Sequence, residues 1–140
     1  MSDVYAIVDT ARDPRLYGLV MQCRERVCLF AGKLESPLDR AAPYLVKMET
    51  GSPLDLAWRR EGVGQSWGIF CHSTASLEDL RKHFRKFLMA KLPDGEAVMF
   101  RFYDPRIWRT YWPSCNDEER AQWLEKVAEF HYEEKFPVKA

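Results

Sequence analysis

Long apolar runs are missing from this chain of 140 residues. No stretch approaches the roughly 18 consecutive apolar residues that a membrane-spanning helix needs, so we expect no membrane partner. The N-terminus, Met1-Ser2-Asp3-Val4, lacks the basic start and apolar core of a signal peptide, which predicts a cytoplasmic protein. The chain also lacks internal repeats, linkers and low-complexity segments, and its length is typical of one domain.

A net charge is missing too, because 21 Lys and Arg balance 21 Asp and Glu. This balance argues against a general binder of nucleic acids. The charges are unevenly spread, with five bases and two acids over residues 77–91 and seven acids and two bases over residues 117–134. We interpret these segments as two solvated helix faces of opposite sign. Complementary docking surfaces for protein partners are the alternative.

Signatures of cofactor and metal binding are sparse. The four cysteines form no Cys-x-x-Cys pair, no Gly-rich phosphate loop follows a strand, and no ligand cluster stands out, so we expect neither a cofactor nor a metal. Cys71 and His72 are adjacent on a predicted strand and point to opposite faces, which disfavours a nucleophile–base pair. We expect His83 on a surface and His131 at the core side of the last helix.

Hydrophobic periodicity predicts an α/β protein. Apolar or alternating runs predict five strands, at residues 4–8, 26–31, 44–49, 67–72 and 97–103. Helices are predicted after Asp13-Pro14, at 54–60, after the N-cap Ser76, at 106–112, and within a helical C-terminal segment over 114–136 that Asn116 caps. This order predicts a single domain over residues 1–140 with a mixed five-stranded sheet covered by helices.

Charged residues interrupt the most aromatic predicted strand, Phe100-Arg101-Phe102-Tyr103, which Asp104-Pro105-Arg106 follows. Buried charges are costly unless they are partnered. We therefore expect Arg101 to join Asp9, Asp104 or Glu49 in a network that holds the fold together. The predicted structural residues are Asp9, Arg101, Asp104, Pro105 and Arg106. The rival hypothesis is a small metal-dependent hydrolase that uses Asp9 and Asp104, since both follow predicted strands.

The C-terminal third is unusually rich in large aromatic side chains. Trp123 and Phe130 lie seven residues apart, on a stripe next to the one formed by Leu124 and Val127. Either the last helix is deeply packed, or the second stripe docks a partner, because aromatic residues are favoured interface anchors. The predicted partner-binding residues are Trp108, Tyr111, Trp112, Trp123 and Phe130.

Five segments in order carry a resemblance to a known family. They are Tyr5-Ala6-Ile7-Val8-Asp9 with Ala11 and Asp13-Pro14; Leu29-Phe30-Ala31-Gly32; Ala42-Pro43-Tyr44-Leu45-Val46; Trp67-Gly68-Ile69 leading to Ser73, Leu77, Leu80, His83, Phe84 and Arg85; and Leu92-Pro93-Asp94-Gly95 through Phe100 to Arg106. Over about residues 4–108 the chain resembles the domain-of-unknown-function 4123 family, the effector adaptors or chaperones of bacterial type VI secretion.

The resemblance implies a non-enzymatic role. Members of the family bind a toxic effector in the donor cell and help load it onto the secretion spike, usually a VgrG protein, without a cofactor. The implied mechanism is bivalent, with one surface for the effector and another for the spike. Many members carry a further lobe after the matched core, where this chain has only the segment after Pro113.

Overall fold

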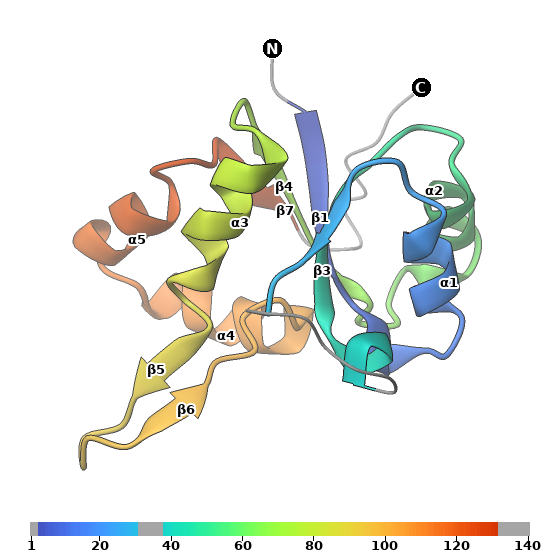
Figure 1. Ribbon diagram of the computed structural model, residues 1–140. Helices are drawn as coiled ribbons and strands as arrows, with labels where there is room; N and C mark the ends of the chain where they lie inside the picture. Colours follow the sequence, from blue (N-terminus) through green and yellow to red (C-terminus); the bar gives the residue numbers. More distant parts are fainter. Residues whose placement is uncertain (1–2, 31–37, 132–140) are drawn as a thin grey trace.

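A five-stranded sheet forms the centre of the computed structural model, which describes residues 3–30 and 38–131 (Figure 1). The strands are β1 (Asp3–Asp9), β2 (Arg26–Cys28), β3 (Pro43–Lys47), β4 (Gly68–Ser73) and β7 (Glu129–His131). Their order in the sheet is β2-β3-β1-β4-β7, and every paired neighbour is antiparallel. The predicted single α/β domain with a five-stranded sheet is confirmed.

The sheet is buried on both faces because β1 is apolar at consecutive positions. Tyr5 and Ile7 point to one face and Ala6 and Val8 to the other, and all four are at most 3% exposed. This arrangement explains why the run reads as continuous rather than alternating. At the centre, the backbone of β1 lies so close to β4 that a Cβ on Gly68 would be 1.9 Å from the Ile7 carbonyl oxygen.

Helices cover both faces, which gives three layers (Figure 1). On one side lie α1 (Leu16–Met21), α2 (Pro53–Ala57) and the π-helical turn η3 (Trp58–Gly62); two short 3₁₀ turns, η1 (Thr10–Arg12) and η2 (Leu38–Ala41), flank the sheet. On the other side lie α3 (Leu77–Arg85), α4 (Pro105–Ser114) and α5 (Asp117–Trp123). None of the helices in these described parts is long and apolar enough to cross a membrane.

Two helix caps lie where the sequence predicts them, whereas the helix predicted after Asp13-Pro14 begins only at Leu16, with Arg15 as its N-cap. The Ser76 side chain accepts a hydrogen bond from the Asp79 amide at the start of α3. At α5, Asn116 and Glu119 form a reciprocal capping box, which satisfies two backbone donors at once. Three acidic residues in the first turn of α5 complement its helix dipole.

Two predicted elements are wrong. The predicted strand 97–103 is a strand only at β6 (Ala97–Met99), which pairs with β5 (Met89–Lys91) in a separate hairpin rather than joining the sheet. The following residues turn into α4, with Asp104 as N-cap and Pro105 in the first turn. Asp-Pro here begins a helix instead of ending a strand. The Asp104 carboxylate accepts a hydrogen bond from the Arg106 amide, and proline has no backbone N–H that would need a partner in the first turn.

The second error lies in the C-terminal segment predicted as helical over residues 114–136. Helix α5 ends at Trp123, and residues 129–131 form β7 at the free edge of β4. The Ala128 amide donates to the His72 carbonyl at 2.7 Å and begins this pairing. The seven-residue spacing of Trp123 and Phe130 therefore reflects a helix followed by a strand, and residues 132–136 lie outside the described part.

Candidate functional site

An ion pair ties the end of β1 to the segment that follows the β5–β6 hairpin. Asp9 is the last residue of β1 and is 2% exposed. Its Oδ2 accepts a hydrogen bond from Arg101 Nη2 at 2.7 Å, and its Oδ1 accepts one from the Ala11 amide at 3.1 Å. The Arg101 side chain is 47% exposed, so water reaches one partner but hardly the other. Of the three predicted acceptors, the structure pairs Arg101 with Asp9.

Asp104 forms a second, separate pair. Its Oδ1 accepts hydrogen bonds from the backbone amide and Nε of Arg106, and its Oδ2 accepts one from Arg106 Nη2 at 2.7 Å. Burial acts to raise the pKa of Asp104, but the Arg106 hydrogen bonds outweigh it and hold the pKa below its usual value of 3.8. Pro105, the residue between the two partners, is buried.

The two aspartates do not resemble an open cation site. Each of their four carboxylate oxygens already accepts a hydrogen bond, and an arginine guanidinium contacts each carboxylate. A bound divalent cation would lie next to these guanidinium charges and would be repelled by them. The arrangement favours the structural network over the hydrolase hypothesis.

The five predicted partner-binding aromatics fall into two groups. Trp108 and Trp123 are each 1% exposed, so neither side chain is at the surface where a partner could contact it. They pack edge to face at a centroid distance of 4.9 Å in the cluster on the α3–α4–α5 side of the sheet. Tyr111, Trp112 and Phe130 are half-buried and remain candidates for contact.

Tyr111 links the surface to this cluster. The Trp123 Nε1–H donates to the Tyr111 hydroxyl at 3.0 Å. Burial raises the pKa of Tyr111 to about 12, although that hydrogen bond acts in the opposite direction. The phenol is therefore neutral at physiological pH and serves as a hydrogen-bond acceptor for a core tryptophan.

His83 is a buried residue that the sequence interpretation placed on a surface. It is 2% exposed, and its Nε2–H donates to the Trp123 carbonyl oxygen at 2.8 Å, so it helps to terminate α5. Desolvation lowers its pKa below 6.5, which favours the neutral imidazole. The sequence interpretation placed His83 on a surface because its neighbours Arg81 and Lys82 are basic. Its position three residues after Leu80, on the apolar stripe of the helix, would have predicted its burial.

Exposed apolar side chains gather on the β5–β6 hairpin, which extends away from the three layers (Figure 1). Met89, Leu92 and Met99 are 55%, 42% and 46% exposed, and we call these three the hairpin surface. Met89 and Met99 are cross-strand partners, so their side chains lie on the same face of the hairpin.

Two shallow hollows adjoin the hairpin surface at Met89. One, of about 260 Å³, is lined by Phe30, Arg85, Leu88, Met89 and Met99. The other, of about 240 Å³, is lined by Lys86, Phe87, Met89, Ala90, Phe100, Tyr111 and Trp123. The second hollow connects the predicted contact residue Tyr111 to the hairpin surface.

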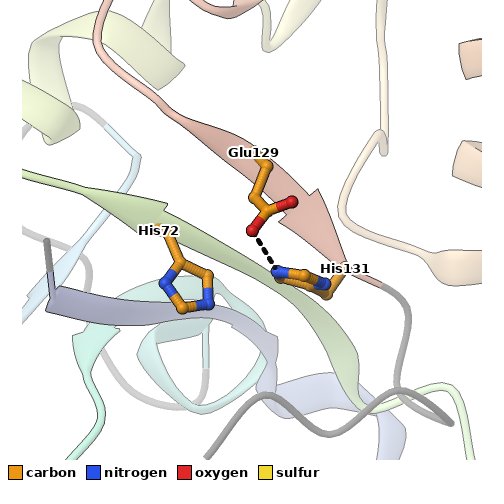
Figure 2. Close-up of side chains that lie close together, drawn as sticks. All are labelled: His72, Glu129 and His131. Atoms are coloured by element: carbon orange, nitrogen blue, oxygen red, sulfur yellow. Dashed lines mark ion pairs between the residues drawn. The ribbon is translucent and has the colours of Figure 1, made fainter.

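A third group was missed because it depends on the placement of β7. His72 on β4 and Glu129 and His131 on β7 bring one potential ligand atom each within 4.8 Å of one another (Figure 2). The Glu129 Oε1 and His131 Nε2 atoms are 3.3 Å apart. Among residues 3–30 and 38–131, this is the group with the composition and spacing to hold a metal ion. A helix through residue 131 would have placed His131 elsewhere, so the sequence interpretation could not assemble it.

The fold and these sites describe a three-layer α/β domain with two arginine–aspartate pairs, an aromatic core and an apolar projecting hairpin. The chain belongs to the family described as Domain of unknown function (DUF4123), which matches residues 4–122. The predicted family is thereby confirmed, and the match reaches through most of α5. No curated protein matches the chain, and no solved structure matches it.

Proposed function

We propose that this protein is a non-enzymatic adaptor that binds a type VI secretion effector in the cytoplasm of the donor bacterium and helps load it onto a VgrG-type spike. Membership of the family supports this proposal through the role that the sequence resemblance implies. The observation that carries it on this chain is the hairpin surface, which has the composition of a docking site.

The hairpin surface is apolar where it is most exposed. Met89, Leu92 and Met99 project from a two-stranded element whose partner strands are both only three residues long. Exposed apolar side chains that lie together, as the cross-strand pair Met89 and Met99 does, mark interaction sites, and methionine adapts its shape to varied partners. A flexible, apolar contact suits a protein that must hold an effector and later release it.

Basic side chains border this apolar centre. Arg85 and Lys86 line the two hollows beside Met89, and Lys91 is exposed at the end of β5. A positive rim attracts an acidic segment and orients it, while the apolar centre contributes most of the affinity. We therefore expect the partner of this surface to present apolar side chains next to acidic residues.

Affinity capture tests the proposal. The tagged chain, expressed in its own bacterium with active secretion, should retain a toxin-like protein and a spike protein that mass spectrometry identifies. Met99→Glu should lose one of them because it places a charge in the apolar centre. Leu56→Glu is the matched control, since Leu56 is 45% exposed against 46% for Met99 but lies on α2, on the other side of the sheet.

The two possible failures have different meanings. Capture of neither partner from actively secreting cells would contradict the adaptor role. Capture of both partners by the wild-type chain and equally by Met99→Glu would keep the role but remove the hairpin surface from it. Thermal melting of both variants confirms that any loss of capture is not a loss of folding.

A further inference from the structure

Three side chains on the β4–β7 pair are arranged for metal binding. His72 lies directly opposite Glu129 in the antiparallel register, and His131 follows two residues after Glu129. Side chains at these positions share one face of the sheet. The structure brings one ligand atom from each residue within 4.8 Å of the others, and Figure 2 shows the three side chains gathered over the two strands.

The chemistry of this group matches zinc. Two imidazoles and one carboxylate are a ligand set that Zn²⁺ uses, with a fourth position open to water. Mg²⁺ and Ca²⁺ prefer sets made of oxygen atoms and fit the two nitrogen donors poorly. We propose that His72, Glu129 and His131 form a zinc site that links β7 to β4.

The distances are close to those of a bound ion. Two ligands bonded at about 2.1 Å to a tetrahedral zinc lie about 3.4 Å apart. The 3.3 Å between Glu129 Oε1 and His131 Nε2 already has this value. The rings of His72 and His131 have centroids 4.9 Å apart, and the three ligand atoms lie within 4.8 Å of one another, so zinc binding requires the His72 nitrogen to move closer to the other two ligand atoms.

The surroundings allow an ion to enter. Glu129 is 62% exposed while both histidines are half-buried, so the carboxylate faces solvent and the imidazoles form the inner side. The neighbouring thiol of Cys71 points to the opposite face, where it is 1% exposed within the aromatic core. Sulfur ligation from Cys71 is therefore excluded at this site by the alternation of the strand.

A zinc ion here would act on a short edge strand of the sheet. Strand β7 has three residues and, in the described part of the chain, pairs only with β4. Its middle residue, Phe130, points to the other face and packs against Trp108 at 4.7 Å. An ion on the outer face would thus hold Phe130 in the aromatic core. This inference is independent of the proposed adaptor function.

Titration of the full, chelator-treated chain with ZnCl₂ tests the site. At a hundredfold excess over the dissociation constant, zinc should raise the melting temperature by about 5–10 °C. CoCl₂ should produce the visible absorption of a four-coordinate cobalt site without the sulfur-to-metal band of cysteine ligation. Affinity should fall as pH decreases, since both imidazoles must be neutral to bind.

Variants locate the ion. Glu129→Gln changes an exposed side chain and should weaken zinc binding by more than the roughly 10–100-fold that loss of an outer contact costs. His72→Ala should abolish the melting shift. Glu125→Gln, an exposed carboxylate outside the group, and Asp104→Asn should both retain it.

Three results would overturn the inference. The first is the absence of any zinc-induced melting shift in the wild-type chain. The second is a shift of equal size in wild type, Glu129→Gln and His72→Ala, which would place the ion elsewhere. A shift lost in Asp104→Asn but kept in Glu129→Gln would overturn it in favour of the aspartate pair.

Discussion

Replacing Trp123 with alanine should unfold the aromatic core rather than remove a surface contact. The indole is 1% exposed and stacks on Phe87 with a centroid distance of 3.8 Å and an interplanar angle of 16°. It also meets Phe102 edge to face at 4.9 Å and donates a hydrogen bond to Tyr111. Every one of these contacts disappears in Trp123→Ala.

The expected cost follows from those contacts. Truncation of a buried tryptophan to alanine costs about 3–5 kcal/mol of unfolding free energy, and the aromatic pairs place this site near the upper end. For a domain of this size the melting temperature should fall by about 10–15 °C. Trp123→Phe keeps an aromatic ring on Phe87 but loses the Nε1–H donor, and should cost about 1–3 kcal/mol.

Urea unfolding followed by circular dichroism measures these values, with Trp112→Ala as the matched control. Trp112 stacks on Trp108 at 5.1 Å but is half-buried, so its loss should cost only about 1–2 kcal/mol. Our reasoning fails if Trp123→Ala unfolds within about 0.5 kcal/mol of wild type, the range of ordinary surface substitutions. That result, together with lost partner capture, would restore Trp123 to the partner interface.

Two further predictions concern charged and titratable groups. Arg101→Ala should lower the unfolding free energy by about 1–3 kcal/mol in urea melts. Of the two hydrogen bonds described for the buried Asp9 carboxylate, the variant keeps only the one from the Ala11 amide. Unchanged stability with lost partner capture would instead assign Arg101 to the interface. His83, whose folded pKa lies below 6.5, should make the domain less stable as pH falls through 6.5, because the unfolded chain then binds the proton first. The slope cannot exceed about 1.4 kcal/mol per pH unit, the value for a difference of one whole proton. The difference between the wild-type and His83→Gln profiles in chelator isolates this contribution from the other histidines, and parallel profiles would contradict it.

The central sheet could be predicted from sequence because burial there leaves a direct pattern. Apolar residues at consecutive positions of β1 require protein on both faces, and the structure supplies helices on both. The caps Ser76 and Asn116 could also be predicted from sequence, since a short polar side chain before a helix accepts a hydrogen bond from a free backbone N–H of its first turn. These signals are local, and the final fold does not override them.

The two misread regions depend on partners far away in the sequence. Phe100 and Phe102 are rich in strand propensity, but Phe102 is buried against Phe84 of α3 instead of continuing the β6 ladder. Residues 124–131 show helical spacing, yet β4 offers an unpaired edge that residues 129–131 complete. In both cases tertiary contacts override the local preference of the residues. The hydrophobic periodicity of one sequence carries no information about such contacts. The candidate site was lost with them, because the zinc group requires β7.

These same regions carry the residues that the core does not explain. Met89 and Met99 on the hairpin contribute exposed apolar area, and Glu129 and His131 lie on the face of β7 opposite to the one from which Phe130 enters the aromatic core. At Met89 and Met99, a sequence under selection for folding alone would place lysine or threonine, because charged or polar edges resist association. Positions where local rules fail without a packing reason are the expected places for function. On this argument, the hairpin surface is where changes should alter binding before they alter folding.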